Sequence, residues 1–201
     1  MNARHVVAAR LVGGRRAVAR VVGASRGRGR RAAGPLLVAS LFAAGCGGDA
    51  PSPLRVTVHS GGLADERATA VATGDGRVLT VAHAVEGARS VRVDGRAARV
   101  VRVDRRRDVA ELAVPGLAAG AARFARGGDT VEVHLLRGTV SARVLRRVTA
   151  RLDGASRPAL ELATRVQPGD SGAPVTDQDG RLVGLVFARG DDSTWVAALT
   201  G

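Results

Sequence analysis

The amino-acid sequence predicts an all-β protein, and three observations support this prediction. Short Val-rich segments alternate between apolar and polar residues, which is the period of a strand with one buried face. Turn residues, often Asp-Gly pairs, separate these segments about every 8–12 residues, a spacing typical of β-sandwiches and β-barrels. Hydrophobic residues form 45% of the 201 residues, which is enough for a core, but aromatic residues form only 2% and Ile is absent. The core is therefore predicted to consist of Val, Leu and Ala.

Two kinds of segment are predicted as strands. The alternating ones are, in chain order, 55–59, 90–94, 99–103, 130–134 and 139–144. The others are continuous apolar runs at 77–85 and 184–188, which predict strands buried on both faces. The Ala-rich segment 117–126 is interpreted as a loop rather than a helical turn, because Gly116 and Gly120 interrupt it. Six strands on either side of this loop are compatible with the length of the chain.

The first 45 residues are predicted to be an export signal. A basic segment at 26–31 (RGRGRR) precedes an apolar run at 34–45 (GPLLVASLFAAG), and Cys46 follows directly. A basic region, a short apolar region and small residues before a cleavage point are the marks of such a signal. The apolar run is too short to span a membrane comfortably, since a spanning helix needs about 20 residues.

Cys46 is the only cysteine in the chain, so it cannot form an internal disulfide. The residues 43–46 (AAGC) resemble a bacterial lipobox, in which the signal is cut before the cysteine and lipid is attached to it. This resemblance implies a membrane anchor at Cys46, on the outer face of the cell membrane or in the periplasm. A plain secretion signal and an uncleaved anchor are the alternatives. Residues 46–53 have the composition of a linker, and the folded body is predicted to span 54–201.

The formal net charge of +13 is unevenly distributed. Residues 1–45 hold nine Arg and no acidic residue, so the other 22 Arg and all 18 acidic residues lie in residues 46–201. The only basic clusters of the body, 105–107 and 146–147, are explained equally well by a solvated surface. Base-stacking platforms also need aromatic side chains, which are scarce here. Nucleic acid is therefore not predicted as a partner, and a basic protein that binds membranes or nucleic acid is the least favoured interpretation.

Three short motifs carry groups suited to chemistry: 79–85 (LTVAHAV), 107–114 (RDVAELAV) and 167–175 (QPGDSGAPV). They contain His83, Asp108 and Ser171 in that order. Taken singly, the motifs are explained by a core histidine, a strand cap and a Gly-rich turn. Taken together, they have the His, Asp, Ser chain order of the chymotrypsin type, which differs from the orders of subtilisin and the α/β-hydrolases. The combination indicates nucleophilic catalysis by a serine.

These motifs resemble those of the chymotrypsin/trypsin-fold serine proteases, over roughly residues 63–199. The chain is most similar to short, disulfide-free bacterial members, including HtrA-like and periplasmic proteases. The resemblance implies two six-stranded antiparallel β-barrels of the trypsin-like type, with the catalytic cleft between them. Barrel 1 is expected at about 54–115 and barrel 2 at about 128–201.

The resemblance also assigns roles to the residues of the motifs. It implies that Ser171 is the nucleophile, that His83 accepts and returns its proton, and that Asp108 orients the imidazole. The backbone N–H groups of Gly169 and Ser171 are expected to form the oxyanion hole. The implied function is an exported serine endopeptidase that cleaves protein or peptide substrates through an acyl-enzyme, without a cofactor or a metal ion.

The substrate pocket is assigned by the same resemblance. Arg165, six residues before the nucleophile, is expected at the base of the pocket. Phe187, in the strand that follows the nucleophile, is expected to line it, and Arg189 to lie at its rim. Two arginines there would favour an acidic substrate side chain, unless either points to solvent.

Asp170 precedes the nucleophile and raises the question of its partner. In trypsin-like zymogens the corresponding carboxylate pairs with a new N-terminal amine, and no matching cut site lies near Leu54. A buried unpaired carboxylate is costly, so an internal arginine is the expected partner, Arg137 first and Arg143 second. The alternative is a partly exposed Asp170 on a mobile loop.

A different class of function remains open. The same fold without catalysis would give a cell-surface pseudo-protease that acts as a binding module, since fold alone does not fix function. Loss of His83, Asp108 or Ser171 would mark that class, and the sequence retains all three.

Overall fold

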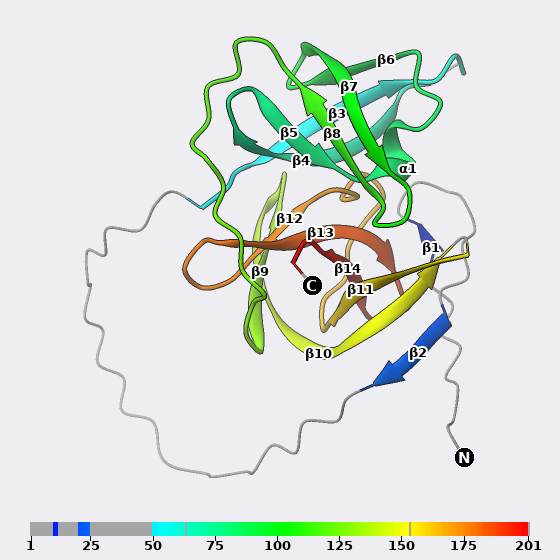
Figure 1. The fold of residues 1–201 in the computed structure, drawn as a ribbon, viewed down its shortest axis with the longest axis vertical. Coiled ribbons are helices and arrows are strands. Elements are labelled where there is room, and N and C mark those ends of the chain that lie inside the picture. The colour runs from blue at the N-terminus through cyan, green and yellow to red at the C-terminus, as the bar shows by residue number, and fades with distance from the viewer. Residues whose placement is uncertain (1–9, 12–19, 25–49, 63, 153, 201) are drawn as a thin grey trace.

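The computed structural model describes residues 10–11, 20–24, 50–62, 64–152 and 154–200. Almost all of the regular structure in these ranges is β-strand, and it forms two barrels that lie one above the other in Figure 1. The prediction of two six-stranded antiparallel barrels is confirmed.

The first barrel is a closed sheet of six antiparallel strands in the order β3-β4-β5-β8-β7-β6. Val and Ala alternate with polar residues along them, so that one face of each strand points into the barrel. Its strands are β3 (Pro53–His59), β4 (Glu66–Gly74), β5 (Arg77–Thr80), β6 (Ser90–Val93), β7 (Arg96–Asp104) and β8 (Val109–Ala113).

The second barrel follows the order β13-β12-β9-β10-β11-β14, and a pairing between β13 and β14 closes it. Its strands are β9 (Thr130–Leu135), β10 (Gly138–Leu152), β11 (Ala155–Leu162), β12 (Pro174–Thr176), β13 (Leu182–Arg189) and β14 (Thr194–Ala198). The segment 116–129 runs between the barrels without helix or strand, apart from a single bridge from Phe124 to Leu182. The loop prediction for 117–126 is confirmed.

Two further short strands add to the second barrel. β1 (Arg10–Leu11) pairs with the end of β13, and β2 (Arg20–Ala24) pairs with β10. Both lie inside the segment predicted as an export signal. Cys46 and the predicted cleavage point lie outside the described residues.

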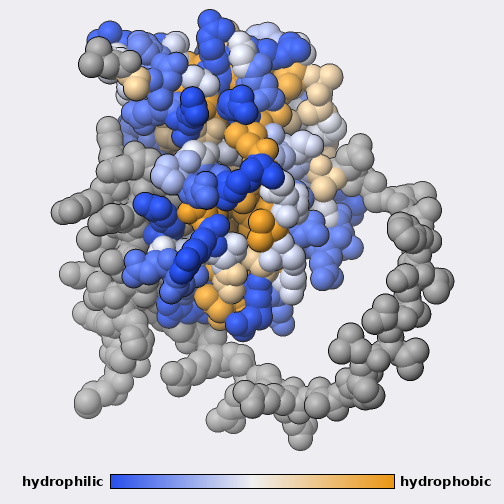
Figure 2. Space-filling view, turned by 180° about the vertical axis from the view of Figure 1, so that it is seen from behind, coloured by the Kyte–Doolittle hydropathy of each residue, from blue (hydrophilic) through white to orange (hydrophobic). Residues whose placement is uncertain are grey.

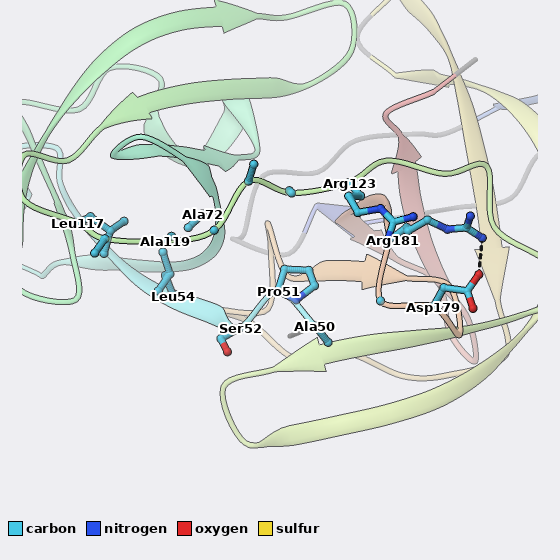
Figure 3. Close-up of a pocket in the computed structure, with 15 residues that line it drawn as sticks. Ala50, Pro51, Ser52, Leu54, Ala72, Leu117, Ala119, Arg123, Asp179 and Arg181 are labelled. Carbon is cyan, nitrogen blue, oxygen red and sulfur yellow. Dashed lines mark hydrogen bonds and ion pairs between the residues drawn. The ribbon is translucent and has the colours of Figure 1, made fainter. Parts of the chain in front are cut away.

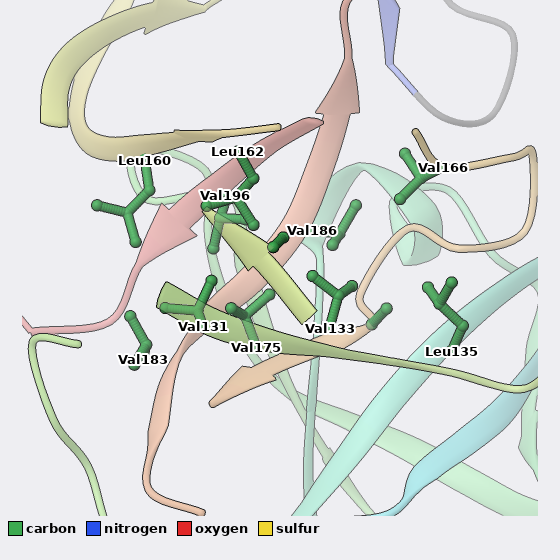
Figure 4. Close-up of a cluster of buried hydrophobic side chains, with 12 residues drawn as sticks. Val131, Val133, Leu135, Leu160, Leu162, Val166, Val175, Val183, Val186 and Val196 are labelled. Atoms are coloured by element: carbon green, nitrogen blue, oxygen red, sulfur yellow. The ribbon is translucent and has the colours of Figure 1, made fainter. Parts of the chain in front are cut away.

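The cores consist of Val, Leu and Ala, with the two largest buried side chains in the second barrel. Trp195 and Phe187 are fully buried in one cluster, which also includes Val71 and Val81 of the first barrel. Figure 4 shows a second cluster, in which Val and Leu side chains of β9, β11, β12, β13 and β14 and of the loop at Val166 pack together. This composition is the one expected from a sequence without Ile and with few aromatic residues.

The predicted strand at 77–85 is wrong in its second half. β5 ends at Thr80, and residues Ala82–Val85 form the one-turn helix α1. The β5–β8 pairing stops at Thr80 opposite Ala110, and the N–H of Ala82 donates instead to the carbonyl of Asp108, at 3.2 Å. Asp108 has a φ of +57°, which turns the chain out of the sheet at this point. The apolar run therefore continues as a helical turn that still packs inward.

No helix among the described residues is long and apolar enough to cross a membrane. Figure 2 shows hydrophilic residues over most of the visible face, with apolar residues gathered toward the middle of the molecule.

Candidate active site

The site is built where the two barrels meet. α1, at the end of β5, carries His83, and the turn before β8 carries Asp108; both belong to the first barrel. Ser171 lies in the turn before β12, in the second barrel. His83 and Asp108, 25 positions apart, are thus brought together within the first barrel, and the docking of the barrels adds Ser171, 63 positions further along the chain.

His83 contacts both other residues. Its Nδ1 lies 2.8 Å from Oδ2 of Asp108, and its Nε2 lies 3.1 Å from Oγ of Ser171. The backbone N–H of His83 also donates to Oδ1 of Asp108, at 3.0 Å. Asp108 therefore holds the histidine at two points, which fixes the ring so that Nε2 faces the serine.

The Ser171 turn packs tightly against β4. The N–H of Thr69 donates to the carbonyl of Ser171 at 2.6 Å, and the Thr69 hydroxyl donates to the carbonyl of Gly169 at 2.8 Å. A Cβ on Gly172 would lie 1.9 Å from the carbonyl oxygen of Thr69, so only glycine fits at this approach. Gly169 has a φ of +99°, a conformation that glycine adopts without strain. The backbone predicted to form the oxyanion hole is therefore held by a strand of the opposite barrel.

Asp170 is buried and paired with Arg137. A terminal nitrogen of Arg137 donates to both carboxylate oxygens of Asp170, at 2.6 and 2.9 Å. Oδ2 of Asp170 also accepts the backbone N–H of Gln167, at 2.7 Å. The internal arginine partner predicted from the sequence is confirmed, with Arg137 rather than Arg143. The pair braces the turn that carries Gly169 and Ser171.

The three residues expected to form the substrate pocket lie in different surroundings. The Arg165 side chain is 75% exposed and forms an ion pair with Asp192, which is equally exposed, rather than lying at the base of a pocket. The pKa of Arg165 is raised by the hydrogen bond and the charge of Asp192. The Phe187 side chain is fully buried in the core rather than lining an open pocket, because the ring gains more from packing there. Arg189 is half-buried at the end of β13.

A cavity of about 690 Å³ opens beside His83 and Asp108. Its other walls are the turn of Arg105 and Arg106 and the start of β11, and Glu86 forms an ion pair with Arg105 at its edge. The cavity borders both barrels and reaches the histidine, but Ser171 and Gly169 are not among its lining residues.

A second cavity, of about 440 Å³, lies elsewhere (Figure 3). It is lined by the inter-barrel segment around Ala119, by Pro51 and Leu54, and by Arg181, which is ion-paired with Asp179. It contains none of the residues of the three motifs, so it is not part of this site.

Sequence reasoning missed two contributors. Thr69 carries no sequence signal of its role, because its bonds to the serine turn depend on how the barrels dock. Arg157, on β11, is buried, and its guanidinium lies 3.5 Å from Oδ2 of Asp108. No sequence signal distinguishes Arg157 from the other 21 arginines of residues 46–201.

Comparisons with known proteins agree with this geometry. Residues 68–185 match the model of the trypsin-like peptidase domain. Among solved structures, the active form of the Rv3671c protease from M. tuberculosis is 25% identical, with a TM-score of 0.61 over 75% of this chain and 77% of that chain. The comparison with curated proteins finds no match.

Two more distant structures show the fold alone. The HtrA-type protease AlgW is 19% identical, with a TM-score of 0.57, and the match covers 75% of this chain and 57% of that one. A human pathogenic astrovirus serine protease is 21% identical, with a TM-score of 0.51, over 73% of this chain and 88% of that one. Since the family model spans more than half of the chain and contains all three motifs, the chain belongs to the family of trypsin-like peptidases.

Proposed function

We propose that this trypsin-like serine endopeptidase cleaves peptide bonds through an acyl-enzyme on Ser171, with His83 and Asp108 as its partners. The observation that carries the proposal is the continuous hydrogen-bonded path through His83, from Oδ2 of Asp108 at 2.8 Å to Oγ of Ser171 at 3.1 Å. A nucleophile, a base and a group that orients the base, all within hydrogen-bond reach, are what acyl transfer requires.

The mechanism follows from the positions of these atoms. Nε2 of His83 accepts the proton of Ser171 while Oγ attacks the scissile carbonyl carbon, and Asp108 stabilises the imidazolium that forms. His83 then gives the proton to the leaving amine, and the amine departs. Water repeats the same steps on the acyl-enzyme and regenerates Ser171. The backbone N–H groups of Gly169 and Ser171 stabilise the negative charge on the carbonyl oxygen.

The Asp170–Arg137 pair supports activity without a proteolytic activation step. The carboxylate already has a cation, at 2.6 and 2.9 Å, inside the same chain. The turn that carries Gly169 and Ser171 therefore does not depend on an N-terminal amine created by cleavage.

We also propose that the protein acts outside the cytoplasm and is anchored by lipid at Cys46. The support comes from the sequence: the basic segment 26–31, the apolar run 34–45 and the single cysteine after it. An anchored protease of this kind would act on proteins or peptides near the membrane surface.

The test of the catalytic proposal is hydrolysis of an unfolded protein such as casein by the purified chain. Ser171→Ala and His83→Ala should each lower the rate by several orders of magnitude, about 10⁶-fold in the best-measured comparable triad, without lowering the unfolding temperature appreciably. Ser141→Ala, at an exposed serine on β10, is the matched control and should retain full activity. A folded native chain that does not hydrolyse casein or other unfolded proteins would instead favour the non-catalytic binding module.

A further inference from the structure

We infer that Arg157 is a positioning residue for Asp108, and that its guanidinium fixes the Asp108 carboxylate against the second barrel in the orientation that His83 needs. This inference rests on the proposed function, because it concerns how the catalytic group of three residues is held. Arg157 does not touch the reacting atoms and takes no part in proton transfer.

The contact involves the oxygen that serves the histidine. One terminal nitrogen of Arg157 lies 3.5 Å from Oδ2 of Asp108, and the same Oδ2 lies 2.8 Å from Nδ1 of His83. The other oxygen, Oδ1, accepts the backbone N–H of His83 at 3.0 Å. The shorter distance leaves the histidine as the principal partner of Oδ2, while the arginine attracts the same oxygen from the opposite barrel.

The guanidinium of Arg157 is almost completely buried, so the free-energy cost of removing its charge from water must be offset by nearby groups. The Arg157 side chain is 3% exposed and the Asp108 side chain 6% exposed, so both charges are removed from water. Burial of a charge is costly unless opposite charge and hydrogen bonds surround it. Arg157 lies over the ring of Phe187, with 5.6 Å from its central carbon to the ring centroid, and donates to the carbonyl of Arg105 at 3.4 Å. Asp108 supplies the opposite charge.

The contact between Arg157 and Asp108 connects the two barrels. Arg157 lies on β11 of the second barrel, whereas Asp108 and Arg105 lie in the β7–β8 turn of the first barrel. Ser171 also belongs to the second barrel, so the distance from His83 to Ser171 depends on how the barrels dock. Arg157 joins the turn that holds the histidine to the barrel that holds the serine.

The turn itself needs such a restraint. Asp108 has a φ of +57°, a conformation that costs a non-glycine residue free energy and persists only where its surroundings enforce it. The Phe187 ring beneath the guanidinium offers no hydrogen-bond donor to the carboxylate. The arginine is a cationic group of the second barrel that attracts the Asp108 carboxylate in this conformation.

The experiment measures how fast Ser171 reacts with a small fluorophosphonate, as a second-order rate constant for the full chain. Arg157→Met keeps an unbranched apolar side chain over Phe187 and removes the charge. Its rate constant should fall about 10- to 100-fold, because small displacements of a catalytic group have effects of this size. The far-ultraviolet spectrum and cooperative unfolding should be retained.

Chemical rescue separates positioning from mere stability. Arg157→Ala leaves a space into which ethylguanidinium fits, and millimolar ethylguanidinium should restore at least a tenth of the native rate constant. Arg157→Lys, which retains the charge without the planar fork, should react faster than Arg157→Met and slower than the native chain. Arg147→Met is the matched control: Arg147 donates to the carbonyls of residues 126, 127 and 128, away from the three catalytic residues, and its loss should change the rate constant less than twofold.

The outcomes are distinguishable. An Arg157→Met rate constant within twofold of native overturns the inference. So does a loss of rate that ethylguanidinium does not restore in Arg157→Ala, because the arginine would then serve only the fold. If Arg157→Met does not fold, the Arg157→Lys rate constant decides, and a value equal to native overturns the inference. A folded native chain that does not react at all would contradict the proposed function instead.

Discussion

Arg137 supplies the positive charge that pairs with Asp170, and loss of this charge should lower the turnover rate rather than weaken substrate binding. Its side chain is 44% exposed, and its guanidinium pairs with the buried Asp170, which precedes Ser171. Arg137→Met should lower kcat by up to about 100-fold with little change in KM, because the turn shapes the oxyanion hole and misplaced donors there cost that much. Steady-state hydrolysis of a fluorogenic peptide separates the two constants.

Arg143 provides the control for this prediction. It was the second candidate from the sequence, and it lies exposed on β10 without a contact to Asp170 among the described residues. Arg143→Met should leave both constants unchanged. Equal effects of the two substitutions, or an unchanged kcat in Arg137→Met, would exclude the pair as a support of the turn.

His134 predicts a pH dependence of stability. It is buried between two threonine hydroxyls, with Nδ1 3.1 Å from Oγ1 of Thr139 and Nε2 2.8 Å from Oγ1 of Thr176. Burial lowers the pKa of His134 from its ordinary value of 6.5, although the nearby charge of Glu132 opposes this. The folded state therefore binds a proton less readily than the unfolded state does, so the free energy of unfolding falls as the pH drops through about 6.5.

The substitution His134→Gln tests this contribution. Glutamine retains hydrogen-bonding groups but does not titrate, so the loss of stability between pH 7.5 and pH 5.5 should be smaller than in the native chain. Urea unfolding at both pH values gives the two differences. A larger loss of unfolding free energy in His134→Gln than in the native chain would mean that protonation of His134 stabilises the fold. That result would contradict a lowered pKa for His134.

At the level of elements, the serine turn packs closely against β4 and β5. Gly172 has a φ of +86°, and a Cβ there would meet the carbonyl oxygen of Thr69 at 1.9 Å and the hydroxyl of Thr80 at 2.6 Å. Gly172→Ala should therefore push the turn away from β4. It should lower the free energy of unfolding by about 2–4 kcal/mol, since backbone strain and overpacking add.

Gly95 separates the two causes. It has a φ of +79°, but a Cβ there would meet nothing within 4 Å. Gly95→Ala should cost only the backbone strain, about 1–2 kcal/mol. Chemical denaturation of both variants measures the difference. Equal losses would mean that Thr69 and Thr80 shift at little cost in free energy. The close contact between the serine turn and the strands would then add nothing to the backbone strain at Gly172.

Several of the strands were predictable because their period is local. Alternation found β3, β6, β7, β9 and β10, and the apolar run at 184–188 found β13. The end of β5 was not predictable, because residues 77–85 are apolar throughout and a buried strand and a buried helical turn have the same composition there. What ends the strand is a hydrogen bond from Ala82 to the Asp108 carbonyl, 26 residues away.

At the level of the whole molecule, the residues of the site fall into two groups: those that stand in recognisable sequence motifs, and those whose contacts form only when the two barrels dock. His83, Asp108 and Ser171 stand in motifs, and the pairing of Asp170 followed from the cost of an unpaired buried carboxylate. Arg157 and Thr69 could not be found in this way, because their contacts form only when the barrels meet. Arg165 was expected at the base of the substrate pocket, but its side chain is exposed and forms an ion pair with Asp192, 27 residues later.

Lipid attachment at Cys46 would place this whole molecule at a membrane. We expect the mature chain to begin at Cys46 and to carry acyl groups there, because the single cysteine follows the apolar run 34–45 directly. Mass spectrometry of the N-terminal peptide from the membrane fraction checks this. Cys46→Ala should prevent anchoring, whereas Cys46→Ala that remains in the membrane fraction, or a mature start elsewhere, would contradict the assignment.

The central claim is that Ser171 is the nucleophile of the chain and that His83 activates it. The most direct test is to treat the full chain with a fluorophosphonate and to map the adduct by peptide mass spectrometry. A single adduct on Ser171 is expected, absent in Ser171→Ala and greatly slowed in His83→Ala, while both variants remain folded. An adduct on another residue, or equal labelling of the folded Ser171→Ala variant, would contradict the claim.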